Sequence, residues 1–119
     1  MSTEEQKTPR ELWVEALRSG KYEQDKEALQ GRKGFCCLGV LCKVAEDNGI
    51  DVLMDSDGRL DGSHLGKQKK VWRWSELANQ EGAFKRIGED EWLTQLNDAG
   101  KSFSEIADII ESEPEGLFL

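Results

Sequence analysis

All three cysteines of the chain fall in one short stretch, FCCLGVLC at residues 35–42. Clustered thiols can hold zinc, form a redox centre or supply a catalytic nucleophile. A structural zinc site needs ligands that converge tetrahedrally, and the chain offers only one histidine, His64, besides the cysteines. On a helix, Cys36 and Cys42 lie about 240° apart around the axis, so they cannot face one ion. The spacing therefore argues against a zinc site.

A catalytic thiol would need a base within reach and an electropositive surrounding. The sequence around the cysteines indicates neither. Small thiols on the apolar face of a helix more often pack the helix against its neighbours. We therefore expect Cys37 and Cys42 to be buried and reduced, and we expect no catalytic residue, no metal and no cofactor.

The strongest candidate for a binding surface is KQKKVWRW at residues 67–74, which combines four bases with two tryptophans and contains no acid. Two tryptophans at this spacing cannot both face the core if the segment is a regular helix. An exposed indole among bases suits an anion or an acidic protein surface, and it could also stack nucleic-acid bases. A competing interpretation places one tryptophan inward and covers the other with lysine stems. The candidate surface consists of Lys67, Lys69, Lys70, Trp72, Arg73 and Trp74, joined by Tyr22 and Arg32 if the ligand is small and phosphorylated.

Two further motifs fail on inspection. DSDGRLDG at residues 55–62 alternates carboxylates, as calcium loops do, but counting from Asp55 puts Leu60 and Gly66 where such a loop needs glycine and glutamate. LNDAGKSFSEIADII at residues 96–110 is typical of the first two helices of a helix-turn-helix. The acidic ESEPEGLFL that follows offers no reading helix. We expect turn chemistry in the first case and no direct DNA reading in the second.

Charge is unevenly distributed along the chain. The formal net charge is −8, and the residues from Gly88 onward carry nine acids against the single base Lys101. The preceding residues balance, with fifteen acids and fifteen bases. An acidic C-terminal third is unsuited to non-specific nucleic-acid binding. It would suit a basic partner, DNA mimicry or solubility alone.

Local signals predict the helices. TPRE at residues 8–11 has the pattern of a capped helix start, with Thr8 as N-cap and Glu11 closing a capping box. We expect further helices over residues 35–47, from Ser75 through Asn79, and on both sides of a turn at residues 97–100. Ser102 and Glu105 form a second capping box for the last of these helices. Pro114 should end it, leaving an apolar tail that either folds back or enters a partner's groove, including that of a second copy.

The remaining segments complete the predicted fold. Residues 50–60 alternate apolar and polar side chains around Asp57–Gly58, which predicts a hairpin. Residues 1–7 are polar and are expected to be flexible, and residues 8–119 should form one globular domain. The predicted class is α+β: a small, mostly helical domain with one short β-hairpin and a C-terminal helical hairpin. The sequence shows no membrane span and no signal-peptide pattern, so we expect an intracellular protein.

Three blocks of the sequence carry a resemblance: WVEALRSGKYEQ (13–24), FCCLGVLC (35–42) and LNDAGKSFSEIADIIE (96–111). Together they resemble a group of small proteins of unknown function that tailed bacteriophages encode. The resemblance implies an accessory phage product in the cytoplasm of the infected bacterium, and it implies no catalytic residues. We therefore expect a non-enzymatic protein that binds a host protein in host takeover or defence evasion. Two alternatives stay open: sequestration of a small phosphorylated ligand, and acidic DNA mimicry.

Overall fold

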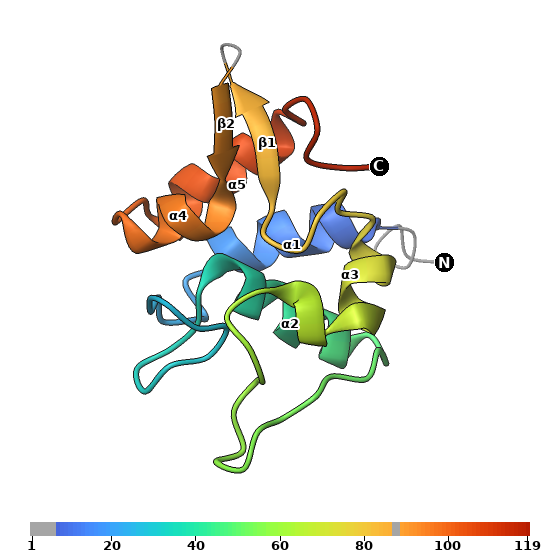
Figure 1. Cartoon of the computed structure of the whole chain (residues 1–119), viewed down its shortest axis with the longest axis vertical. Coiled ribbons are helices and arrows are strands. Elements are labelled where there is room, and N and C mark those ends of the chain that lie inside the picture. Colours follow the sequence, from blue (N-terminus) through green and yellow to red (C-terminus); the bar gives the residue numbers. More distant parts are fainter. Residues whose placement is uncertain (1–6, 87–88) are drawn as a thin grey trace.

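Helix α2 (Cys37–Asp47) lies at the centre of a computed structural model that describes residues 7–86 and 89–119 (Figure 1). Eight of its eleven residues are buried. It carries the cysteine stretch, and the predicted burial of Cys37 and Cys42 is confirmed. All three thiols are free. The predicted helix over 35–47 thus exists, although it begins two residues later than expected.

Helix α1 (Pro9–Arg18) packs against α2 and α5. Its start has the predicted capping box between Thr8 and Glu11. The indole of Trp13 is fully buried, and its Nε1 donates to the Cys37 carbonyl oxygen at 2.9 Å. The predicted flexible segment 1–7 lies, except for Lys7, outside the described residues.

Helices α4 (Leu93–Asp98) and α5 (Phe103–Glu111) form the predicted C-terminal helical hairpin. The capping box between Ser102 and Glu105 is present. Helix α5 lies along α1 (Figure 1) and buries Phe103, Ile106 and Ile110. No helix follows α5 in the described part of the chain, so the hairpin has no third helix of the kind that reads DNA.

The middle of the chain differs most from the prediction. A 3-10 turn, η2 (Leu65–Lys67), leads into helix α3 (Lys69–Ser75). The helix predicted from Ser75 through Asn79 is therefore wrong in position, because Ser75 ends a helix instead of starting one. The reason is local: Glu76 takes a left-handed conformation, with φ of 62°, which stops α3.

The regular hairpin also lies elsewhere than predicted. Strands β1 (Ala83–Arg86) and β2 (Glu89–Trp92) pair antiparallel, from Ala83 opposite Trp92 to Arg86 opposite Glu89. Residues 50–60 instead form a long loop with one antiparallel bridge, Met54 to Leu60, around the expected Asp57–Gly58 turn. The molecule is nevertheless a small α+β domain, as predicted.

The apolar tail folds back onto the same chain. Leu117 is fully buried, and its carbonyl oxygen accepts from the Ala78 amide at 2.8 Å. Phe118 forms a bridge with Leu77, and the Arg10 guanidinium lies 4.0 Å from the centre of its ring. Folding back was one of the two predicted outcomes, although the tail contacts the segment between α3 and β1 more than the helical hairpin.

The side chain of Asn97 joins the three sequence blocks at one buried point. Its Oδ1 accepts from Gln24 Nε2 at 2.8 Å and from the Cys37 amide at 3.2 Å. Its Nδ2 donates to the Asp25 carbonyl oxygen at 2.8 Å. A buried amide with all its bonding capacity in use fixes the relative positions of the segments that it links. The three blocks thus meet in one buried hydrogen-bond network that supports the scaffold.

Candidate functional site

The turn η2 and helix α3 carry the predicted basic and aromatic residues. Lys69, Lys70 and Arg73 are exposed, and both Trp72 and Trp74 are half-buried. The indole Nε1 of Trp72 donates to the Leu77 carbonyl oxygen at 2.9 Å, which fixes the ring while part of it stays open to solvent. We call the set Lys67, Lys69, Lys70, Trp72, Arg73 and Trp74 the α3 surface.

Two hollows lie on either side of Lys69, which lines both. The first, which we call the tail groove, encloses about 350 Å³. Its lining consists of Lys69, Trp72, Arg73, Leu77, Ala78 and Leu119. The second, the loop groove, encloses about 650 Å³. Its lining consists of Asp51, Leu53, Gly66, Lys67, Gln68, Lys69 and Lys70.

The bases of the α3 surface are only partly neutralised. Lys70 Nζ lies 3.1 Å from an Asp51 carboxylate oxygen, and Lys67 Nζ lies 3.8 Å from Asp61. All of these side chains are exposed except Asp61, which is half-buried, and such surface pairs are weak and exchange readily with solvent or a partner. Lys69 and Arg73 form no ion pair with any described residue. The surface therefore retains net positive charge for a ligand.

The structure does not bring Tyr22 and Arg32 to this surface. Both lie in the segment between α1 and α2. The ring of Tyr22 meets Phe35 edge-on, with centroids 5.7 Å apart, and Arg32 is exposed. No hydrogen bond, ion pair or ring contact within residues 7–86 and 89–119 links either residue to α3. The predicted eight-residue set is thus split, and six of its members stay together.

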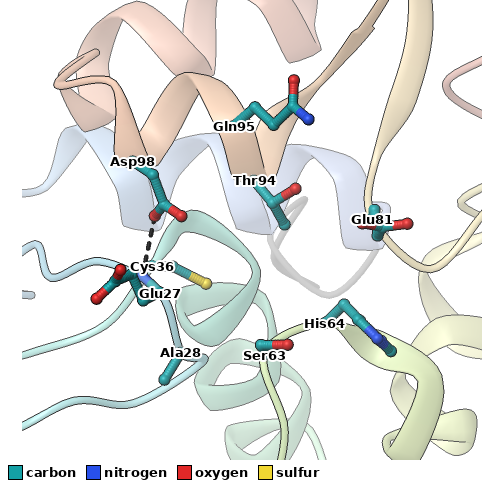
Figure 2. A pocket seen from close by; sticks show the side chains of 9 residues that line it. All are labelled: Glu27, Ala28, Cys36, Ser63, His64, Glu81, Thr94, Gln95 and Asp98. Atoms are coloured by element: carbon teal, nitrogen blue, oxygen red, sulfur yellow. Dashed lines mark hydrogen bonds between the residues drawn. The ribbon is translucent and has the colours of Figure 1, made fainter.

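A third hollow, which the sequence did not indicate, lies between α4 and the start of α2 (Figure 2). It encloses about 340 Å³, and the Cys36 sulfur points into it. Its residues come from several distant segments, so no local pattern could have indicated it. Its lining consists of Glu27, Ala28, Cys36, Ser63, His64, Glu81, Thr94, Gln95 and Asp98. We call it the Cys36 pocket.

The chemistry of the Cys36 pocket is acidic and polar. Burial, together with the negative charge of Asp98, raises the pKa of the Cys36 thiol to about 11. The thiol is therefore protonated at neutral pH and is not activated as a nucleophile. Asp98 Oδ1 accepts from the Glu27 amide at 2.9 Å, and His64 Nδ1 accepts from the Gly66 amide at 3.0 Å. These bonds orient the walls of the pocket, and no lysine or arginine lines it.

Neither place gathers the ligands of a metal ion. Among the described residues, no group of three or more histidine, cysteine, aspartate or glutamate side chains is arranged to hold one. The stretch that alternates carboxylates is a turn, in which Asp55 Oδ1 accepts from the amides of Asp57 and Arg59 at 2.8 and 3.1 Å.

None of the described helices is long and apolar enough to cross a bilayer.

The fold and the α3 surface define a small α+β domain that presents a basic, partly aromatic helix beside two grooves. Residues 5–114 match the family described as a domain of unknown function, DUF8296, and the chain belongs to that family. No curated protein and no solved structure matches the chain.

Proposed function

We propose that this protein is a non-enzymatic accessory protein of a bacteriophage, which binds a host protein in the bacterial cytoplasm through the α3 surface. The observation that carries the proposal is the exposure of Lys69 and Arg73 beside the half-buried Trp72. Tryptophan and arginine dominate the energetics of protein interfaces. A fixed indole flanked by unpaired bases is a preorganised contact, which binds with little loss of side-chain entropy.

A protein partner fits these residues better than a small phosphorylated ligand does. Sequestration of such a ligand would draw on Tyr22 and Arg32 to close the site, and both lie in another part of the fold. The two grooves are open hollows joined along one helix, which suits an extended partner surface. Small ligands are usually enclosed more completely.

DNA mimicry is also less well supported. A mimic needs a surface of strongly negative potential, and bases beside the carboxylates reduce this potential even where their ion pairs are weak. Within the part of the chain that the structure describes, five of the nine acids in the C-terminal third form ion pairs, among them Asp108 and Glu111 with Arg18. The remaining pairs are Glu91 with Arg86, Glu105 with Lys101, and Glu113 with Arg10.

The test compares proteins captured from a bacterial lysate by the immobilised chain and by two charge-reversed variants. Lys69→Glu combined with Arg73→Glu should abolish capture of a host protein that the wild type enriches. The matched control, Lys26→Glu with Arg32→Glu, reverses two exposed charges between α1 and α2 and should leave capture unchanged. Equal capture by all three proteins would contradict the proposal.

A further inference from the structure

Two exposed apolar side chains lie on the loop before α3, and one of them lines the loop groove. Leu53 is 57% exposed and Met54 is 42% exposed, and Leu119 is the other large hydrophobic residue with comparable exposure in the described part of the chain. Leu53 lines the loop groove together with Lys69 and Lys70. Neighbouring apolar side chains that stay in water and are rimmed by charged residues mark interaction surfaces, whereas scattered single ones do not.

The loop that carries Leu53 and Met54 is held in place by Gln68. Gln68 is buried, and its Oε1 accepts from the Leu53 amide at 2.8 Å. Its Nε2 donates to the carbonyl oxygens of Leu53 at 2.8 Å and Asp61 at 3.1 Å. The side-chain amide of Gln68 thus bonds both the N–H and the carbonyl oxygen of Leu53, as a neighbouring strand would.

The other end of the loop is equally well fixed. The Asp61 amide donates to the Leu53 carbonyl oxygen at 3.0 Å, and the Leu60 amide donates to Gln30 Oε1 at 3.0 Å. The Leu60 side chain is buried. The exposed position of Leu53 and Met54 is therefore built into the fold, because the loop cannot turn them inward without breaking these bonds.

We propose that the loop groove is the docking site for an acidic, amphipathic peptide segment of the partner. Apolar side chains of that segment cover Leu53 in the groove and its neighbour Met54, and carboxylates of the segment pair with Lys69 and Lys70. The inference rests on the proposed function and deepens it by naming the chemistry of the partner. Charge complementarity carries it: Lys67, Lys69 and Lys70 line the groove, and Asp51 is the single acid among its lining residues.

Substitution of Asp51 tests the inference, because it should tighten the binding of the partner segment. Its carboxylate pairs with Lys70 in the free protein, at 3.1 Å, and both side chains are exposed. An incoming carboxylate has to displace Asp51 from Lys70. Asp51→Asn removes this competition and should tighten the binding of an acidic peptide, whereas a merely structural loop would show no gain.

The experiment selects binders from a displayed library of random peptides on the immobilised protein and then measures their affinity by fluorescence anisotropy. The selected peptides should be net negative and carry at least two bulky apolar residues. Leu53→Ser combined with Met54→Ser should weaken their binding about tenfold, and Lys69→Glu should do so as well. Lys26→Glu is the matched control for Lys69→Glu, since it reverses an exposed charge between α1 and α2, and it should leave the affinity unchanged.

Several outcomes would overturn the inference. These are enrichment of neutral or basic peptides, no enrichment at all, or acidic peptides that bind the double serine variant as tightly as the wild type. A dimer in light scattering that the double serine variant converts to monomers would assign the groove to a second copy instead. If a captured host protein depends on Lys69 and Arg73 but tolerates the double serine variant, the proposed function stands and this inference fails.

Discussion

At the scale of single residues, Asn97 shows why the sequence blocks are structural. Each of its four hydrogen bonds reaches a different group, on Gln24, Asp25, Cys37 and Asp98. Removing a buried amide leaves its former partners unsatisfied, and this costs more than the bonds themselves contribute. Loss of the Asn97 side chain should therefore destabilise the fold.

Asn97→Ala should lower the free energy of unfolding by about 3 kcal/mol. The Cys37 amide and the Asp25 carbonyl would both lose a buried partner. Chemical denaturation of the purified variant measures the change. Gln95→Ala, at an exposed position of the same helix, should change stability by no more than about 0.5 kcal/mol. Similar stability of the two variants would show that Asn97 is not the link between the blocks.

The thiols lead to a second expectation, on reactivity and pH. Burial raises the pKa of all three, in Cys36 from 9.0 to about 11. In the folded protein at pH 7, all three should react far more slowly with a thiol-specific chromogenic reagent than after unfolding. Rapid reaction of one thiol in the folded state would contradict the structure.

The same shifts fix the sign of the stability change at high pH. An unfolded thiol loses its proton near pH 9, whereas the folded Cys36 keeps it to about pH 11. The folded state therefore binds more protons in this window, and stability should fall as the pH rises through it. Melting curves between pH 8 and about pH 10 check the fall, which should be smaller in Cys36→Ala.

At the scale of elements, Gly39 allows α2 to lie close to the segment that precedes it. A Cβ at this position would lie 1.8 Å from the Leu29 carbonyl oxygen, which itself accepts from the Cys36 amide at 3.2 Å. The backbone of residue 29 therefore lies directly on the helix. Only a residue without a side chain permits this approach.

Gly39→Ala should consequently destabilise the protein, although alanine favours an isolated helix by about 1 kcal/mol. Forcing α2 away from Leu29 should cost about 3 kcal/mol, the upper part of the range for overpacked cores. Glu46→Ala, on the exposed face of α2, serves as the control and should be close to neutral. A more stable Gly39→Ala protein would mean that the segment before α2 moves freely.

The helices whose ends are set by local interactions are those that the sequence predicts well. Thr8 with Glu11 and Ser102 with Glu105 form capping boxes within four residues, so the start of α1 and of α5 can be read directly. Helix α3 has no side-chain cap, since the preceding Gln68 uses its amide on Leu53. The same side chain occupies the amide and the carbonyl oxygen of Leu53, which a regular strand over residues 50–54 would have paired with a neighbouring strand. These interactions join distant segments and leave no local signal.

At the scale of the whole molecule, the sequence predicts part of the candidate site. The composition of residues 67–74 identifies the α3 surface, because bases and tryptophans are concentrated there. It does not identify the loop groove, which exists only because Gln68 places Leu53 beside Lys69. The Cys36 pocket likewise depends on tertiary packing. The composition of a segment thus indicates where the basic residues are, whereas the grooves beside them can be found only from the tertiary structure.

The C-terminal tail contacts the segment after α3, strand β1 and helix α1. The amides of Lys85 and Leu119 donate to the carbonyl oxygens of Glu115 and Glu76 at 2.7 and 2.8 Å, and Leu117 fills a fully buried position. Phe118 lies beneath Arg10, which also pairs with Glu113. The tail therefore packs like an additional edge segment between α3, β1 and α1.

Deleting residues 116–119 should therefore destabilise the protein. The loss of one fully buried leucine alone costs about 3 kcal/mol, and for a domain of this size the melting temperature should fall by about 10 °C. Leu117→Ala should reproduce most of the fall, whereas Leu119→Ser, at a side chain that is 87% exposed, should not. Light scattering of the same samples distinguishes the role of the tail: a dimer that becomes monomeric on deletion, with an unchanged melting temperature, would show that the tail serves a second copy instead of its own chain.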